Sequence, residues 1–317
     1  MNVIIGIGAL LVLIAVLIYP AFRVLHFAYG AARMRAAQGK LIRSDELLSL
    51  SSQRSYKDII YQLERRGFKE LLELKGSDYR EELAQGLLRR HFNDNLRKII
   101  NSVPTKYKPF FLTLAKEEDI RLINTVKRVK KHDRTGLISD MFSYTPGFSR
   151  KTIQEIDSMS LDEFYLICRK AGYPTENLYQ WFFESLRSCA VDEVLLSYTK
   201  LLIDVHNVTE ALGRSFNLIE GGKHDEVLLP LKDASQDDVI NALEKTPFRC
   251  ENVFCIMRKI LGVKKDFAQK LKSQDPLSIK PFISYHIEKE LELKNIRMLL
   301  KLVHSRAAPE HIEEVLV

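Results

Sequence analysis

Apolar residues recur at three- and four-residue spacing along most of the chain. The pattern is clearest over residues 59–74, 120–129, 194–212 and 291–303, where it predicts amphipathic helices with one buried face. Convincing two-residue alternation is missing, and no Asn-Gly or Asp-Gly pair signals a hairpin. Short breaks containing Gly or Pro separate the helical segments. The pattern therefore predicts an all-α fold.

The first part of the chain follows a different pattern. Residues 3–22 carry no charged side chain, and a helix of that length, rising 1.5 Å per residue, crosses a bilayer core of about 30 Å. Basic residues follow this run and none precedes it, so the positive-inside rule places the remaining chain in the cytoplasm. We expect a retained single-pass anchor in the cell membrane. A cleaved signal peptide, which would need a basic start and a shorter apolar core, and a buried core helix are the alternatives.

Three segments share a spacing that predicts a serine-capped helix. Each has a Ser, an acid three residues later, an apolar pair at the next two positions and an apolar residue at the eighth. Each then closes with a Gly or Pro followed by an aromatic residue. The serines and closing pairs are Ser55 with Gly67-Phe68, Ser160 with Gly172-Tyr173, and Ser235 with Pro247-Phe248. The Ser predicts an N-cap, and the closing pair predicts a turn that directs the aromatic into the core.

A second set of three segments alternates with the first. Each begins with an acid, carries apolar residues one, four and seven positions later, and has a base at the ninth or tenth. The acids are Asp119, Asp204 and Glu292. One interpretation is a core-facing stripe with the acid at its margin; the other is that equivalent acids ring a shared surface. The apolar run described above sets an anchor at residues 1–26. For the rest of the chain, the alternation of the two sets predicts three pseudo-repeated lobes at 27–135, 136–218 and 219–317, whose termini are free to interleave.

Several stretches resemble the C subunit of the A/V-type ATPases, the counterpart of the d subunit of the eukaryotic V-ATPase. The similar stretches are YGAARMRAAQGKL at 29–41, DVHNV at 204–208 and PFISYHIEKELELKNIR at 281–297. The resemblance spans residues 27–316 and implies a funnel-like body of three similar lobes without an active site. The sequence departs from the family in its added membrane helix. It also departs at Leu122, where the other two repeats have Asn207 and Asn295.

The chemistry-bearing residues form no recognisable catalytic or metal-binding constellation. No phosphate-binding loop is present, the eight histidines are scattered, and no Cys/His spacing suits zinc. We expect no cofactor and no metal. The four cysteines are interpreted as reduced, packed thiols, and Cys250 and Cys255 would lie about 140° apart on a helix. The basic run at 127–132 has no interleaved aromatics, which favours a solvated helix end over a nucleic-acid site.

The resemblance implies a non-catalytic coupling subunit of a rotary ATP synthase. Such a protein links the membrane rotor ring to the central stalk and transmits torque during ATP-coupled proton or sodium transport. Its expected partners are the ring proteolipids, the central-stalk subunits and membrane lipid around residues 3–22, and not nucleic acid. The net charge of +7 favours acidic partners. The candidate ring- or lipid-facing collar is Arg33, Arg35, Lys40 and Arg43.

Two other hypotheses remain beside this one. The first is a membrane-anchored helical-repeat scaffold that recruits soluble proteins and has no link to a rotor. The second, an enzyme, is disfavoured because no nucleophile, base and orienting group can be assembled.

The coupling hypothesis carries one further expectation. Because the body would be centred on the axis of the ring, the helix at residues 3–22 would lie in the lumen of the ring.

Overall fold

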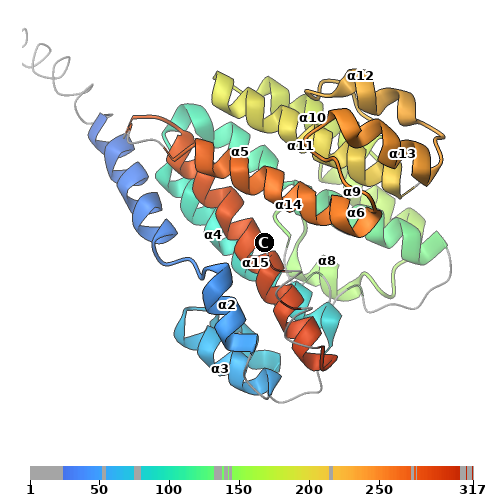
Figure 1. The fold of residues 1–317 in the computed structure, drawn as a ribbon. Coiled ribbons are helices and arrows are strands. Elements are labelled where there is room, and N and C mark those ends of the chain that lie inside the picture. The colour runs from blue at the N-terminus through green and yellow to red at the C-terminus, as the bar shows by residue number, and fades with distance from the viewer. Residues whose placement is uncertain are drawn as a thin grey trace, which may run out of the picture.

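The computed structural model describes residues 24–51, 55–74, 80–131, 138, 142, 145–213, 217–272, 275, 277–307, 312 and 316 (Figure 1). The predicted membrane-spanning run at residues 3–22 lies outside this part. Within it, no helix combines the length and apolar character that a bilayer crossing needs. The described part has no β-strand, and its β-pairing is one isolated bridge between Thr145 and Phe148. The all-α prediction is confirmed.

The described chain is a succession of helices, beginning with residues 24–38. The α-helices that follow are α2 (Ser44–Ser51), α3 (Tyr56–Arg65), α4 (Glu81–Ser102), α5 (Lys108–Ala115), α6 (Glu117–Lys131), α8 (Arg150–Glu155), α9 (Leu161–Lys170), α10 (Leu178–Ser188), α11 (Glu193–Leu212), α12 (Asp225–Leu228), α13 (Gln236–Ala242), α14 (Val253–Lys270) and α15 (Lys280–His304). Short 3-10 turns are η1 (Lys69–Leu74), η2 (Thr105–Tyr107), η3 (Leu229–Leu231) and η4 (Leu243–Lys245).

The longest helix, α15, runs through the middle of the molecule (Figure 1). It packs against α14, α4, α2 and α3. Because α15 is covered on several sides, most of its residues are buried, including charged Lys289 and Glu292. The helix at residues 24–38 reaches it through a close approach at Gly30. A Cβ at Gly30 would lie 2.4 Å from the carbonyl oxygen of Ser102 and 3.0 Å from the ring of Phe282.

The buried apolar residues form three clusters. The largest joins the helix at residues 24–38, α4 to α6, α9 to α11 and the first half of α15. A second joins residues 42–88 to the second half of α15. The third lies between the end of α11, α12, α13 and the start of α14. Segments from both ends of the chain therefore share one core, the second cluster.

The three serine repeats begin helices as predicted. The Ser55 Oγ accepts the backbone N–H of Lys57, and Ser160 and Ser235 form reciprocal capping boxes with Glu163 and Asp238. The aromatic residues Phe68, Tyr173 and Phe248 that close the three repeats are all buried.

The amphipathic pattern at residues 59–74 continues through the turn that the closing pair Gly67-Phe68 predicts. Helix α3 ends at Arg65, and Gly67 adopts a φ of 101°, a left-handed conformation that glycine accepts without strain. The chain resumes as the 3-10 turn η1. Gly172 adopts the same left-handed conformation after α9, with a φ of 81°. Side chains on both sides of each turn still reach the same core, which is why the apolar spacing continues through it.

Candidate functional site

A charged recess with a volume of about 580 Å³ lies where six helices meet. Its walls come from α4, α6, α10, α11, α14 and α15, which are far apart in sequence. The charged residues lining it are Glu81, Glu117, Glu210, Glu290, Arg121, Arg258, Lys264, Lys294, Arg297 and Lys301. Six cations face four acids, so the lining carries a net positive charge.

Glu290 of α15 is the centre of the ion pairs in the recess. Its two carboxylate oxygens each accept a hydrogen bond from Lys264 Nζ at 2.9 Å, and Lys294 Nζ lies 2.8 Å away. Burial raises the pKa of Glu290, but the two ammonium groups outweigh it and hold the pKa well below its usual range. Glu290 is therefore ionised at neutral pH and fixes α14 to α15 beneath the recess.

A second group of ion pairs joins α15 to α4. Arg297 donates to Glu81 Oε1 at 2.8 Å, and Lys301 Nζ lies 3.0 Å from Glu81 Oε2. Burial raises the pKa of Glu81, whereas hydrogen bonds from both bases lower it, and the net shift is downward. On the α6 side, Arg121 pairs with Glu117 one turn before it at 2.5 Å. The first two pairs link α15 to α4 at the recess, and the third lies within α6.

The recess also has an apolar wall and an apolar mouth. The ring of His206 lies 4.4 Å from that of Tyr179 and 5.5 Å from that of Phe183. Burial lowers the pKa of His206, which favours the neutral ring. At the mouth, Phe254 and Met257 of α14 are 59% and 45% exposed. Large exposed apolar side chains beside charged ones are typical of a surface that binds another protein.

A smaller cavity of about 120 Å³ shares Glu117, Arg121, Glu290, Lys294 and Arg297 with the recess. The ion pairs therefore form a wall between the two spaces. His286 lines the smaller cavity. Burial lowers its pKa to about 4, so the imidazole is neutral at physiological pH.

The three repeat acids lie in the interior: Asp119 is 0%, Asp204 2% and Glu292 4% exposed. Each accepts hydrogen bonds from backbone N–H groups of a distant segment. Asp119 accepts from Gly147 at 2.9 Å, Asp204 from Lys223 and His224 at 2.9 and 3.1 Å, and Glu292 from Ile42 at 2.7 Å. Their burial favours the core-facing interpretation over a ring of acids at a shared surface.

The segments that the acids hold have equivalent positions in the sequence. Gly147 precedes Ser160 by 13 residues, Lys223 precedes Ser235 by 12, and Ile42 precedes Ser55 by 13. Each acid thus fixes the approach to the next serine-capped helix. For Glu292, the last acid in the chain, that helix is the first of the three, α3. The hydrogen bond from Ile42 therefore ties the C-terminal helix to the N-terminal segment.

The first repeat has Leu122 where the other two have an asparagine, and its hydrogen bonds differ accordingly. In the second repeat, the buried Asn207 amide bonds to both the N–H and the carbonyl of Ile219 at 2.8 Å. Leu122 is fully buried and has no amide. The first repeat instead uses the hydroxyl of Tyr173, which donates to Asp119 at 2.6 Å. The equivalent aromatics Phe68 and Phe248 have no hydroxyl to donate.

The predicted collar lies along and after the first described helix. Arg33 is exposed on that helix, Arg35 is half-buried and donates to the carbonyl of Asp275 at 3.4 Å, and Lys40 and Arg43 are exposed beyond it. The helix is tied to α15 by Gln38, whose amide donates to Ser284 Oγ at 2.9 Å and to Glu288 at 3.3 Å. The collar is thus separate from the recess.

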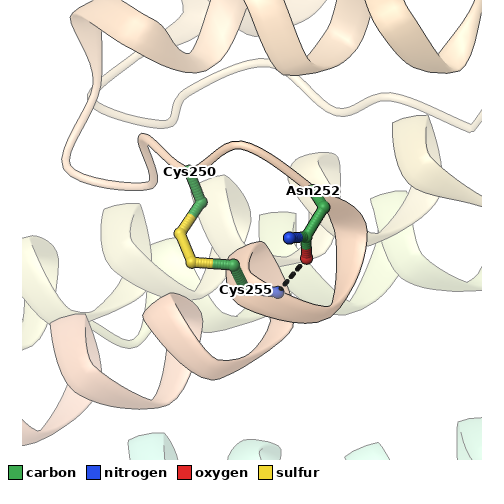
Figure 2. Close-up of a disulfide and its surroundings, with 3 residues drawn as sticks. All are labelled: Cys250, Asn252 and Cys255. Carbon is green, nitrogen blue, oxygen red and sulfur yellow. Dashed lines mark hydrogen bonds between the residues drawn. A yellow bond between two sulfur atoms is a disulfide. The ribbon is translucent and has the colours of Figure 1, made fainter.

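Cys250 and Cys255 form a disulfide, so the interpretation of all four cysteines as reduced thiols is wrong for this pair (Figure 2). Cys250 precedes α14, and Asn252 caps that helix by accepting from the N–H of Cys255 at 2.9 Å. The helical separation of 140° therefore does not apply, and the Cα atoms are 5.7 Å apart. Cys168 and Cys189 are free thiols, and burial raises the pKa of Cys168 to about 12.

The basic run ends a helix, as expected. Helix α6 ends at Lys131, with Arg128, Lys130 and Lys131 in its last turn, where they complement the helix dipole. Across the described part of the chain, no three His, Cys, Asp or Glu side chains gather closely enough to hold a metal ion.

Fold and site together define an all-α protein with a charged recess. Its longest described helix connects the recess to the N-terminal segment. The sequence pattern of the ATP synthase (C/AC39) subunit family matches residues 31–315. The C subunit of the A-type ATP synthase of Pyrococcus furiosus is 25% identical over 91% of this chain and 90% of its own length. The corresponding C subunits of Thermococcus onnurineus and Methanocaldococcus jannaschii are 22% and 21% identical, over 91% and 92% of this chain and 89% and 86% of their own lengths. The chain belongs to the ATP synthase (C/AC39) subunit family.

Proposed function

We propose that this chain is the non-catalytic coupling subunit of an A/V-type ATP synthase. In this proposal it joins the membrane rotor ring to the central stalk and transmits torque between them during ATP-coupled proton or sodium transport. Residues 3–22 anchor it in the cell membrane, within the lumen of the ring, and the body lies in the cytoplasm. Family membership, and relatives named as C subunits of A-type ATP synthases, support a place in such a complex.

The observation that carries the proposal is the double attachment of α15. One face of this helix supplies Glu290, Lys294 and Arg297 to the recess. Its other side holds Ile42 through Glu292 and the helix at residues 24–38 through Ser284 and Glu288. A single continuous helix therefore connects the recess to the segment next to the predicted anchor. A helix packed on several sides transmits force with little deformation.

The recess is the proposed contact for the central stalk. Its excess of cations suits an acidic partner surface, and Phe254 and Met257 offer an apolar rim. The collar residues Arg33, Arg35, Lys40 and Arg43 face the ring or its lipids in this arrangement. The three-lobed division at residues 27–135, 136–218 and 219–317 is part of the proposal. It is supported by the hydrogen bonds that join each acid-bearing helix to the approach to a serine-capped helix, with α15 holding the N-terminal segment.

A pull-down of the tagged chain from membranes in mild detergent, read by mass spectrometry, tests this assignment. Arg258 is exposed at the recess, and Arg169 is exposed on α9 outside it. We expect Arg258→Glu to lose the central-stalk subunits while keeping the ring, and Arg169→Glu to keep both. Deleting residues 1–22 should weaken recovery of the ring.

The same experiment separates the coupling function from its alternative. Recovery of soluble partners without any ATPase subunit would overturn the coupling function and favour the membrane-anchored scaffold. Equal recovery of the stalk by both charge-reversal variants would show that the recess is not the stalk contact.

A further inference from the structure

The helix at residues 24–38 buries one face and leaves the other uncovered by the described residues. Phe27, Ala31 and Met34 point into the core and are 8%, 0% and 2% exposed. On the opposite face, Leu25 and Tyr29 are 63% and 67% exposed, among the most exposed large apolar side chains of the described protein. Such an apolar stripe beside basic residues is typical of a contact surface and unusual for one facing water.

This uncovered face continues along the helix with regular spacing. Leu25, Tyr29, Ala32 and Ala36 follow one another at intervals of four, three and four residues, which places them on one side. Ala32 and Ala36 are exposed, as is Arg33 beside them. The face therefore begins with two large apolar side chains and becomes smaller and more basic toward its C-terminal end.

The charge of the segment identifies a partner of opposite sign. No Asp or Glu occurs before Asp45, while Arg23, Arg33, Arg35, Lys40 and Arg43 all precede it. Basic segments next to an apolar anchor are attracted to membranes that contain anionic lipids. Tyr is also enriched at the membrane–water interface, because its ring is apolar and its hydroxyl remains in contact with polar groups.

Chain geometry keeps the uncovered face close to the predicted membrane run. Leu25 follows Phe22 by three residues, so even a fully extended chain holds it within about 10 Å of the end of that run. Tyr29 lies one helical turn further, roughly 6 Å along the axis. The headgroup layer on each side of the bilayer core is about 5 to 7 Å thick. Leu25 therefore lies at headgroup depth or directly beside it, and Tyr29 lies within about 16 Å of the end of the apolar run.

The opposite side of this helix is fixed to the body, which sets the direction of the uncovered face. The ring of Phe27 contacts those of Tyr107 and Phe282, with centroids 5.9 Å away in both cases. The close contact at Gly30 holds the next turn against α4 and α15. In Figure 1 this helix (dark blue) runs along the edge of the molecule, beside the connection between α14 and α15. Its outward side chains cannot rotate into the core without breaking these contacts.

We propose that the outward face of residues 24–38 is a lipid-binding surface of the protein. Leu25 and Tyr29 lie among lipid headgroups, which in the proposed complex are those of the lipid that the ring encloses, and Arg33 and Lys40 bind the phosphates of anionic lipids. The inference rests on the proposed function only for the membrane position of residues 3–22. The proposal names lipid as the partner of the collar, and it adds Leu25 and Tyr29 to the residues that contact the lipid.

Depth-dependent fluorescence quenching tests this surface in the full-length chain. The protein is reconstituted into vesicles of phosphatidylcholine and phosphatidylglycerol, without any other ATPase subunit. Tyr29→Trp places a reporter on the face, and Phe254→Trp places a matched exposed reporter on α14. Trp181 is the only native tryptophan, so the unmodified protein supplies its background.

We expect lipids brominated near the headgroup to quench the Tyr29→Trp signal about twofold or more beyond that of Phe254→Trp, as for an interfacial helix. Aqueous iodide should quench Phe254→Trp more strongly. Replacing phosphatidylglycerol by phosphatidylcholine, or Arg33 by Gln, should reduce the lipid quenching at position 29.

Iodide quenching of both reporters to the same extent, with no effect of brominated lipid, would overturn the proposal. Shielding of position 29 that occurs only after purified ring is added would overturn it in favour of a protein contact. Neither failure involves the central stalk or torque transmission, so the coupling function is decided separately by the pull-down.

Discussion

Asp119 shows how a single buried carboxylate can organise a whole segment. It accepts hydrogen bonds from the Gly147 N–H and the Tyr173 hydroxyl, which belong to the segments before and after α9. Burial raises the pKa of Asp119, and these hydrogen bonds partly offset that effect. An ionised acid in the core is costly unless it is hydrogen-bonded, so each donor has a measurable effect on stability.

Removing the tyrosine hydroxyl should therefore destabilise the protein. We predict that Tyr173→Phe lowers the free energy of unfolding by about 2 kcal/mol, as for a hydrogen bond to a charged acceptor. Tyr165→Phe is the matched control, since it removes the hydroxyl of a half-buried tyrosine on the same α9. Urea denaturation in mild detergent measures both. Equal, small losses would show that Asp119 does not depend on Tyr173.

The buried His286 makes the free energy of unfolding depend on pH in the acid range. Its folded pKa of about 4 lies below the usual value of 6.5, so the folded state resists protonation more than the unfolded state does. Its contribution to stability is present above pH 6.5 and is lost as the pH falls toward 4, a loss of about 3 kcal/mol by linkage. We predict that His286→Phe flattens the decline of unfolding free energy between pH 7 and 4. An unchanged slope in this variant would contradict the assignment.

At the scale of elements, much of the organisation could be predicted because its signals are local. A Ser followed by an acid three residues later is a complete helix start within four residues, and it identified α9 and α13 correctly. The turn after α3 was also predicted, from the pair Gly67-Phe68, although the apolar spacing continues through it. The cysteine pair was missed because the cap at Asn252 places Cys250 outside the helix.

The capping serines provide a test at this scale. We predict that Ser160→Ala lowers the free energy of unfolding by about 1 kcal/mol, because the N–H of Glu163 loses its acceptor. Ser160→Gly should cost only about a few tenths of a kcal/mol, since glycine tolerates the cap position. Thermal or urea unfolding distinguishes the two. A larger loss for Gly than for Ala would argue against the capping role.

At the scale of the whole molecule, the recess could not be predicted from the sequence. Its charged residues come from Glu81 to Lys301, and none has a spacing that marks it as functional. Only folding brings α4, α6, α14 and α15 together, and the ion pairs of Glu290 and Glu81 are consequences of that packing. The acids Asp119, Asp204 and Glu292 were found because their helices repeat, and in each repeat the acid accepts hydrogen bonds from a distant backbone segment.

The path from the recess through α15 to the N-terminal segment is the physical basis of the proposed coupling function. Glu290 and Glu292 are two residues apart on one helix, yet the first faces the recess and the second holds Ile42. A load applied in the recess therefore reaches the N-terminal segment without crossing a flexible linker.

The most direct test measures ATP hydrolysis and ATP-driven ion transport together, in vesicles that carry the complete complex with and without this chain. We predict that removing the chain leaves hydrolysis by the catalytic head but abolishes transport. Adding back the full-length protein should restore transport, as should Arg169→Glu, whereas Arg258→Glu should restore much less. Transport that continues at its normal rate in the absence of the chain would contradict the coupling function.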